Sequence, residues 1–179
     1  MSEKIIFLDR DGVINYDGAR GEYISSHEDF KFLPGSLQAL KRLTDAGYKI
    51  IIISNQAGVA KGLYSKEDLD KITAKMTKGT QEIGAKIYSV NYCMHQDEDM
   101  CDCRKPKPGL IERAAKGLDV DFGNTFFIGD SRRDILAGKA VGLKTVFVMT
   151  GNTKLEDLDV KPDFIAKDLL GAVDKIVLK

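Results

Sequence analysis

The sequence contains no tryptophan, only four prolines and only three cysteines among its 179 residues. It also lacks an excess of either charge, because 27 lysine and arginine residues balance 27 aspartate and glutamate residues. Balanced charge argues against a protein dedicated to nucleic acid or to an anionic membrane surface. Long apolar runs are missing too, since a run such as Ile50–Ile53 is far too short to span a bilayer. We therefore expect neither a nucleic-acid partner nor a membrane partner.

Apolar residues make up 43% of the chain, which is enough for a hydrophobic core. The length suits one domain, so we expect residues 1–179 to form a single unit, and we expect a monomer. Acidic Asp9 and Asp11 appear where a secretory signal would be cationic and then apolar, which favours a cytoplasmic protein. In that compartment, clustered cysteines indicate metal binding or redox chemistry before disulfides.

Short β-rich runs alternate with helical patterns along the chain. The run Tyr48–Asn55 is continuously apolar and β-branched, as expected for a strand covered on both faces. Such alternation predicts parallel βαβ units, hence an α/β fold in which a mainly parallel central sheet lies between two layers of helices. The expected strands are Lys4–Asp9, Tyr48–Asn55, Lys86–Cys93, Thr125–Asp130, Lys144–Met149 and Asp163–Ala166. The expected helices are Ser36–Gly47, Ser65–Met76, Pro108–Leu118, Arg133–Gly142 and a terminal helix from Asp168.

Polar residues stand at the ends of three expected strands. Asp9 and Asp11 close the first, Ser54 closes the second, and Asp130 closes the fourth, with Asp134 shortly after. Ligands of parallel sheets bind beyond the carboxyl ends of the strands, so these side chains should meet at one edge. Lys105, in the loop after the third strand, is expected at the same edge.

This set of residues suits phosphoryl transfer. Carboxylates from separate strands make an oxygen site for Mg²⁺, and packed carboxylates would repel one another without a cation. A metal, a lysine and a hydroxyl together stabilise the charge on a transferring phosphoryl group, and an aspartate can itself attack phosphorus. Each cluster alone is a weak signal, because an Asp-Gly pair is often only a turn and an aspartate often only a helix cap.

The ordered set resembles the haloacid dehalogenase superfamily of phosphohydrolases. The matching residues are D-x-D-G-V at Asp9–Val13, Ser54, Lys105 and G-D-x-x-x-D at Gly129–Asp134. The resemblance implies a Rossmann-like core in which Asp9 is the nucleophile and Asp11 is the general acid and base. It further implies that Asp9, the Asp11 backbone carbonyl and Asp130 hold catalytic Mg²⁺. The remaining implied roles are phosphoryl binding by Ser54 and Lys105, and support of the metal's water shell or orientation of Lys105 by Asp134.

Two further stretches narrow the resemblance. Ser54–Ser65 and Cys93–Gly109 are similar to the capless, zinc-containing phosphatases that act on D-glycero-D-manno-heptose 1,7-bisphosphate. This implies a small phosphorylated sugar as partner and hydrolysis of its C7 phosphate, a step of lipopolysaccharide-precursor synthesis. Histidinol-phosphate phosphatase is the nearest alternative, and polynucleotide 3′-phosphatase is disfavoured by the zero net charge. A zinc-stabilised binding module without catalysis is the alternative from another class. The sequence departs from the heptose pattern at Ala57, Lys61 and Ser131.

The segment 92–109 contains all the cysteines. Cys93-x-His95 and Cys101-x-Cys103 offer four ligands that suit tetrahedral Zn²⁺ and leave no open coordination position, so we predict a structural zinc site. Unmetallated thiols in a loop, or a redox pair at Cys101 and Cys103, are the alternatives. Fixing Cys103 would also restrict where the adjacent Arg104 and Lys105 point.

Substrate contacts are expected from loops, because the resemblance implies that no cap domain is present. Arg104 offers a planar guanidinium for a phosphate or hydroxyl group. The residues expected to contact substrate are Asp17, Arg20, Asn55, Gln56, Lys61, Arg104 and Ser131.

Overall fold

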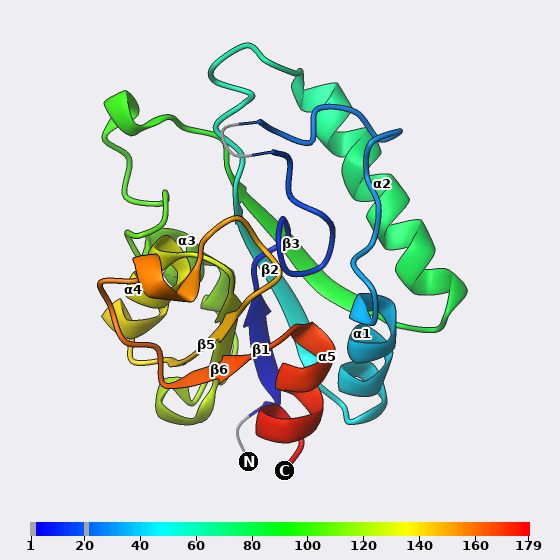
Figure 1. Ribbon diagram of the computed structural model, residues 1–179, viewed down its shortest axis with the longest axis vertical. Coiled ribbons are helices and arrows are strands. Elements are labelled where there is room, and N and C mark those ends of the chain that lie inside the picture. The colour runs from blue at the N-terminus through cyan, green and yellow to red at the C-terminus, as the bar shows by residue number, and fades with distance from the viewer. Residues whose placement is uncertain (1–2, 20–21) are drawn as a thin grey trace.

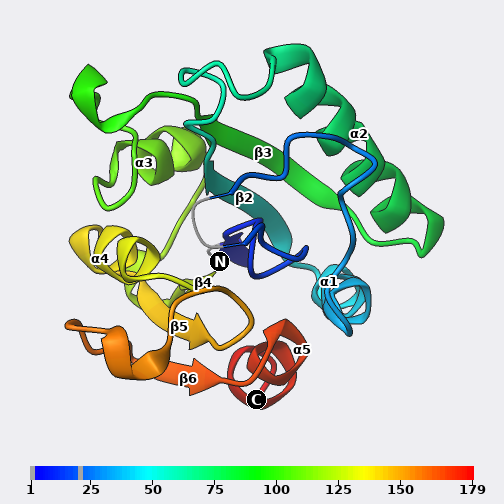
Figure 2. The same ribbon diagram turned by 45° about the horizontal axis from the view of Figure 1, so that its top comes forward.

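The computed structural model describes residues 3–19 and 22–179 and contains one six-stranded sheet. All strands are parallel, in the order β3-β2-β1-β4-β5-β6 (Figure 2). The strands are β1 (Ile5–Leu8), β2 (Lys49–Asn55), β3 (Ile87–Cys93), β4 (Phe126–Gly129), β5 (Lys144–Val148) and β6 (Phe164–Ala166). The predicted α/β fold with a parallel central sheet is confirmed.

Helices cover both faces of the sheet, which makes the expected three layers. Figure 2 shows α1, α2 and α5 on one side of the strands and α3 and α4 on the other. The helices are α1 (Ser36–Asp45), α2 (Lys66–Glu82), α3 (Gly109–Ala115), α4 (Arg132–Ala140) and α5 (Leu169–Ala172). A π-helical turn (η4, Val173–Val177) continues α5, and three short 3₁₀ turns are η1 (Asp97–Asp99), η2 (Phe122–Asn124) and η3 (Leu155–Asp157).

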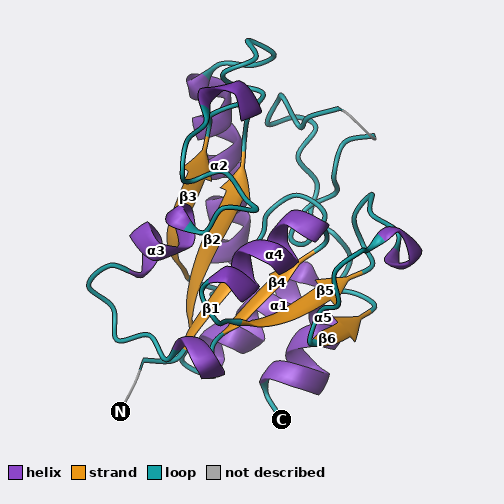
Figure 3. Ribbon diagram, turned by 90° about the vertical axis from the view of Figure 1, so that its left-hand side faces the viewer, coloured by secondary structure: helices purple, strands orange, loops and turns teal. Residues whose placement is uncertain are grey.

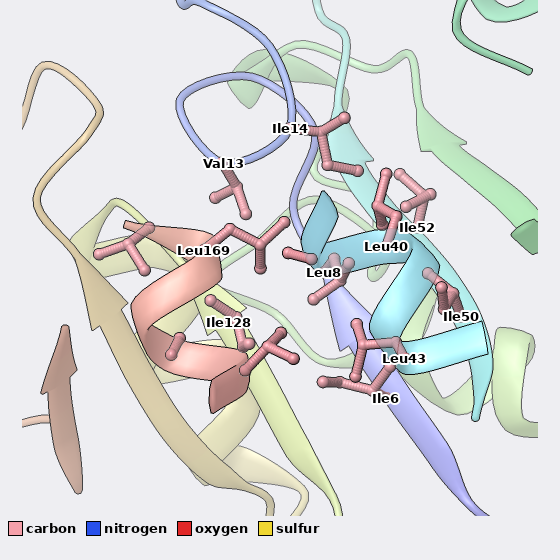
Figure 4. Packing of buried hydrophobic residues seen from close by; sticks show 14 of the residues in the cluster. Ile6, Leu8, Val13, Ile14, Leu40, Leu43, Ile50, Ile52, Ile128 and Leu169 are labelled. Carbon is pink, nitrogen blue, oxygen red and sulfur yellow. The ribbon is translucent and has the colours of Figure 1, made fainter. Parts of the chain in front are cut away.

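The alternation of side chains along β1 and β2 divides the core between the two faces. Ile50 and Ile52 pack with α1 and α5 in one cluster, part of which Figure 4 shows. Ile51 and Ile53 pack into a second cluster with α3. Successive side chains of a strand point to opposite faces, so a continuously apolar strand is what a doubly covered sheet requires.

Helix α2 begins where the sequence predicts and ends later. Ser65 caps it in a capping box, accepting a hydrogen bond from the Asp68 backbone, while the Asp68 side chain accepts one from the Ser65 backbone. The expected end at Met76 is wrong, because the helix continues through Gly79 to Glu82. At Gly79 an added Cβ would lie 2.6 Å from the Phe32 ring, so the glycine is explained by packing against that ring.

The loops that build the site lie at the carboxyl ends of the strands. Figures 1 and 3 show the loops that follow β1 and β2 gathered at this end of the molecule. The described residues between β1 and α1 form turns and isolated bridges, such as Asn15 with Phe32. Among all the described residues, no helix is long and apolar enough to cross a membrane.

Candidate active site

A cleft of about 390 Å³ opens at the carboxyl ends of β1, β2 and β4. Eight of the residues predicted from the sequence line it, and they come from the three strand ends, the segment after the cysteines and the start of α4. These eight are Asp9, Asp11, Asp17, Ser54, Asn55, Lys105, Asp130 and Ser131. The chain thus brings most of the residues predicted for catalysis, magnesium binding and substrate contact into one cavity.

The Lys105 ammonium group lies at the base of this cleft and is fixed by three acceptors. Its Nζ donates to the Ile53 carbonyl at 2.8 Å and to Asp134 Oδ1 at 2.6 Å. It also lies 3.0 Å from Asp9 Oδ1. Because an ammonium has three N–H groups, the position of this buried charge is fully determined. Burial alone would lower the pKa of Lys105, but Asp134 and Asp9 outweigh it and raise the pKa.

Asp9 has one occupied and one open oxygen. Oδ1 accepts from the Arg10 backbone N–H at 2.7 Å and from Lys105, whereas no described residue donates a hydrogen bond to Oδ2. Burial raises the pKa of Asp9 to about 7, with Lys105 opposing the rise and the Asp134 and Asp11 charges adding to it. Asp9 is therefore held in place with one oxygen free to react or to bind a cation.

Asp130 is the buried carboxylate whose charge is least compensated by the described residues around it. Burial, together with the nearby charges of Asp134 and Asp9, raises the pKa of Asp130 well above its usual range. Within the described residues its carboxylate has no hydrogen-bond donor. At Gly12, where φ is +77°, an added Cβ would lie 2.5 Å from Asp130 Oδ2, so the loop after β1 closes tightly over this carboxylate.

The donor set of this cluster fits a divalent metal. One carboxylate oxygen from each of Asp9, Asp130 and Asp134 lies within 4.8 Å of the other two. Three carboxylates against the single Lys105 ammonium leave an excess of negative charge when ionised, which a divalent cation would balance. Asp134 has both oxygens occupied, by Lys105 on Oδ1 and by the Ser131 backbone and hydroxyl on Oδ2. Asp9 and Asp130 are thus the better-suited ligands for Mg²⁺.

Asp11 is held differently, by a fully buried arginine. Arg10 Nε donates to Asp11 Oδ1 at 3.0 Å and Arg10 Nη2 to Oδ2 at 2.9 Å, a bidentate pair. Asn15 Nδ2 also donates to Oδ1, at 2.8 Å. Arg10 is 0% exposed, and its guanidinium lies over the Tyr92 ring, 5.5 Å from the centroid. The sequence analysis missed Arg10, and only its place between two catalytic-type aspartates could have indicated it.

The structure places Gln56 below the cleft rather than on its wall. Gln56 is only 1% exposed, and its Nε2 donates to Asp11 Oδ2 at 2.8 Å and to Ser54 Oγ at 3.0 Å. Its Oε1 accepts from the Tyr64 hydroxyl at 2.6 Å. Its amide nitrogen and oxygen both have partners inside the protein. The expected contact between Gln56 and the substrate is therefore corrected: Gln56 contacts Asp11, Ser54 and Tyr64 instead.

Asn55 lines the cleft and also ties β2 to the segment after the cysteines. Its Nδ2 donates to the Lys105 carbonyl and its Oδ1 accepts from the Lys105 N–H, both at 3.0 Å. This paired contact fixes the Lys105 backbone against the end of β2. Asp17 also lines the cleft and accepts from Asn152 at 2.8 Å, and burial raises its pKa, with Asp11 adding to the rise.

The predicted zinc ligands converge. Cys103 Sγ lies 3.1 Å from Cys93 Sγ, 3.5 Å from Cys101 Sγ and 3.2 Å from His95 Nδ1. Cys93 Sγ lies 3.7 Å from both Cys101 Sγ and His95 Nδ1. Ligand atoms on a tetrahedral zinc would be about 3.5–3.8 Å apart at ordinary bond lengths. Three of the five separations lie in that range and two, at 3.1 and 3.2 Å, are shorter, so the four donors already converge and their chemistry fits zinc. All three cysteines are free thiols, which disfavours a disulfide pair.

Besides Gln56, two expected substrate contacts among the described residues, Arg104 and Lys61, do not line this cleft. Arg104 Nε donates to Asp97 Oδ1 at 2.6 Å and lines a neighbouring cavity of about 120 Å³. Lys61 Nζ donates to the Tyr23 hydroxyl at 3.2 Å, on the outer wall. Arg20 lies outside the described residues. Arg104 lowers the pKa of Asp97 through its hydrogen bond and its charge, and the charge of Lys61 lowers it further.

Several residues outside the list of expected substrate contacts also line the cleft. Arg133 is the most informative, because among the described residues none forms a hydrogen bond or ion pair with its guanidinium. Arg132 lines the cleft as well but pairs with Asp159 at 2.5 Å. Two arginines in the first turn of α4 oppose the helix dipole, and that unfavourable placement was the available signal. The others are Glu22, Tyr23, Ile24, Asn152 and Thr153.

Comparison with known proteins places this site in a family. A family model described as "HAD-hyrolase-like" matches residues 102–172. The chain is 35% identical over 181 residues to D-glycero-beta-D-manno-heptose-1,7-bisphosphate 7-phosphatase of Haemophilus ducreyi, covering 97% of this chain and 98% of the relative. It is 40% identical over 152 residues to the Helicobacter pylori J99 protein of the same name, covering 84% and 86%.

Solved structures agree. The D,D-heptose 1,7-bisphosphate phosphatase of B. bronchiseptica, crystallised with magnesium and phosphate, superposes with a TM-score of 0.92 at 34% identity, covering 98% of both chains. The corresponding protein of Burkholderia thailandensis gives a TM-score of 0.77 at 29% identity, covering 99% of this chain and all of the other. The chain therefore belongs to the D,D-heptose 1,7-bisphosphate 7-phosphatase family of haloacid dehalogenase-like phosphatases.

Proposed function

We propose that this phosphatase removes the C7 phosphate from D-glycero-β-D-manno-heptose 1,7-bisphosphate through an aspartyl-phosphate intermediate. The observation that carries the proposal is the meeting of Asp9, Asp11, Ser54, Lys105 and Asp130 in one cleft. The names of the relatives support the substrate and its anomer. We further propose that the whole chain is one catalytic unit.

In the first step, the open oxygen of Asp9 attacks the C7 phosphorus and the bond from phosphorus to the sugar oxygen breaks. The leaving sugar oxygen takes a proton from the protonated form of Asp11, which also lines the cleft. In that form, the Asp11 oxygen that carries the proton gives up one of the hydrogen bonds that it accepts from Arg10 and the two amides. Ser54 Oγ and the Lys105 ammonium stabilise the negative charge on the phosphoryl oxygens. The Asp9 oxygen that contacts Lys105 stays in place while the other one reacts.

In the second step, water attacks the phosphorus of the aspartyl phosphate. Asp11, now ionised, accepts a proton from the water, the bond between Asp9 and phosphorus breaks, and inorganic phosphate leaves. Asp9 and Asp11 return to their starting states. Lys105 remains paired with buried Asp134 throughout, which keeps its charge aimed at the phosphoryl group.

Asp9, Asp130 and the Asp11 backbone carbonyl would hold Mg²⁺. The cation supplies charge neutralisation of the phosphoryl oxygens and of the clustered carboxylates. Cys93, His95, Cys101 and Cys103 would hold a structural Zn²⁺, which stabilises a loop with little core of its own. That loop carries Lys105 to the cleft.

The second phosphate of the substrate needs a cation away from Lys105. Arg133 lines the cleft, and its charge also contributes to the lowered pKa of Asp97, as do those of Arg104 and Lys61. The rim beside Asp97 therefore brings three cationic side chains near one another. We propose that Arg133 contacts the phosphate at C1, with Arg104 and Lys61 behind it.

The assay that tests the function compares kcat/KM for both anomers of heptose 1,7-bisphosphate with that for histidinol phosphate. We expect the β anomer to be preferred and phosphate to be released from C7. An Asp9→Asn variant should lose at least about a thousandfold in kcat, because it removes the nucleophile. Preference for histidinol phosphate would refute the substrate, and near-normal turnover by Asp9→Asn would refute the mechanism.

Magnesium affinity should depend on pH. The pKa of Asp9 is raised from 3.8 to about 7 in the metal-free protein. The contribution of this group to the free energy of unfolding is therefore fully present below about pH 4 and is lost as the pH rises through about 7. Since Mg²⁺ binds the ionised form, its apparent Kd should be about tenfold weaker at pH 6 than at pH 8. Calorimetric titration of the metal-free site measures this. Asp159→Asn, an exposed change, is the control, and equal affinity at both pH values would contradict the prediction.

Removal of zinc should loosen the loop and misplace Lys105. We expect Cys101→Ser to lower Tm by about 5–10 °C, which corresponds to a few kcal/mol for a chain of this size. It should also reduce the zinc content, expose residues 94–104 to protease and lower kcat/KM. Glu98→Gln, in the same loop and not a ligand, is the matched control. Unchanged activity and protection after chelation, with only Mg²⁺ restored, would show that zinc does not support the site.

The Arg133→Gln variant tests whether Arg133 contacts the phosphate at C1. Loss of a charge-assisted hydrogen bond should reduce kcat/KM for the bisphosphate by about 10–100-fold. Hydrolysis of a monophosphate such as p-nitrophenyl phosphate should stay within about twofold, because no second phosphate is present. Arg42→Gln, on α1, is the control for a change of charge. An equal loss on both substrates would assign Arg133 to a different role.

A further inference from the structure

We propose that Tyr64 is a positioning residue for the proton-transfer step, acting through Gln56 on Asp11 and Ser54. The proposal deepens the proposed function and rests on it. Neither Tyr64 nor Gln56 contributes an atom to the reaction. Together they fix the orientation of two groups that do.

The Gln56 amide can lie in either of two orientations, and its partners select one: the Asp11 carboxylate accepts from the nitrogen and the Tyr64 hydroxyl donates to the oxygen. A side-chain amide has two N–H donors on its nitrogen and only acceptor capacity on its oxygen. The Tyr64 hydroxyl donates to Gln56 Oε1 at 2.6 Å. The nitrogen must then face the other way, toward Asp11 Oδ2 at 2.8 Å and Ser54 Oγ at 3.0 Å. In the reverse orientation the amide oxygen would face the Asp11 carboxylate, acceptor against acceptor.

One amide group thereby sets two catalytic side chains. Its first N–H holds Asp11 Oδ2, beside the buried Arg10 that holds the same oxygen at 2.9 Å. Its second N–H occupies a lone pair of Ser54 Oγ. The Ser54 hydroxyl hydrogen is then directed away from Gln56, and the cleft that Ser54 lines is where a phosphoryl oxygen would accept it.

The chain is folded locally to bring Tyr64 to this place. The loop from Gln56 turns back on itself, with the Leu63 N–H donating to the Gly58 carbonyl at 2.9 Å. A Cβ at Gly58 would lie 2.1 Å from the Tyr64 ring, so only glycine allows the ring to lie there. The ring is 6% exposed, and burial raises the pKa of its hydroxyl, which keeps it a donor.

Tyr64 also connects this unit to the cleft wall. Its ring contacts that of Tyr23, with centroids 6.1 Å apart, and Tyr23 lines the cleft. A continuous contact therefore runs from the substrate-facing wall through Tyr64 and Gln56 to Asp11. Removal of the Tyr64 hydroxyl would leave Gln56 Oε1 buried without its partner and would weaken the hold on the amide nitrogen that faces Asp11.

The test uses the dependence of proton donation on the leaving group. A sugar alkoxide is a poor leaving group and needs the proton from Asp11, whereas p-nitrophenolate does not. For Tyr64→Phe we expect kcat/KM for the heptose bisphosphate to fall about fivefold, the value of one neutral hydrogen bond. For p-nitrophenyl phosphate, which depends on Gln56 only through Ser54, kcat/KM should stay within about twofold, because the Ser54 hydroxyl hydrogen can still reach the phosphoryl oxygen. The KM for the sugar should not rise. Tyr88→Phe, on exposed β3, should change neither substrate.

A double-mutant cycle makes the test independent of folding defects. In an Asp11→Asn background, Tyr64→Phe should lower the sugar-phosphate rate by less than about twofold, because the proton donor that it positions has been removed. A proportional fall on both substrates in Tyr64→Phe, or no fall on either, would overturn the proposal. So would a full additional fivefold loss in the Asp11→Asn background. If the wild-type protein does not hydrolyse heptose bisphosphate, the proposed function fails, and the same cycle run on an alkyl phosphate that it does hydrolyse still decides the role of Tyr64.

Discussion

The structure depends on the placement of one buried ammonium group. Lys105 Nζ joins the end of β2 through the Ile53 carbonyl, the first turn of α4 through Asp134, and the end of β1 through Asp9. These partners are far apart in the chain and meet only because the carboxyl ends of parallel strands share one edge. Isolated burial of any of these charges would be strongly unfavourable, so each needs the others in place. The same set of contacts around Lys105 therefore fixes the catalytic geometry and stabilises this edge of the sheet.

Because Lys105 must be held in this position, the loop that contains the cysteines has to be fixed as well. Lys105 lies two residues beyond Cys103, and its backbone pairs with the Asn55 side chain at the end of β2. Such a loop has little apolar contact to hold it, apart from the buried sulfurs of Cys93 and Cys103, which join the core beneath α3. Four ligand atoms converge at this point and suit a metal, whose bonds would hold the loop in place of apolar contacts. The loop does not line the reacting centre, and its importance lies in where it delivers Lys105.

The sequence predicted the sheet and the carboxylate cluster well, for identifiable reasons. The β-branched run of β2 and the Ser65 capping box are local signals, and the positions of Asp9, Ser54 and Asp130 follow once the strands are parallel. The role of Gln56 was wrong because burial of a polar side chain depends on partners that arrive from elsewhere, here Asp11 and Tyr64. Arg104 was expected in the cleft, yet Asp97 of its own loop holds it outside. Distant pairings of this kind leave no periodic pattern in the sequence.

The two aspartates of the D-x-D pair differ in chemistry because they differ in partners. Asp9 is buried and forms an ion pair with the Lys105 ammonium, which also pairs with Asp134. One oxygen of Asp9 accepts no hydrogen bond from the described residues. Asp11, with 22% of its side chain exposed, is clasped by a guanidinium and two amides. A carboxylate that must attack phosphorus needs an open oxygen, whereas one that must hand a proton to a departing group needs a fixed direction. Asp9 meets the first condition and Asp11 the second, and the intervening Arg10 enforces the difference, since its backbone N–H holds Asp9 while its side chain holds Asp11.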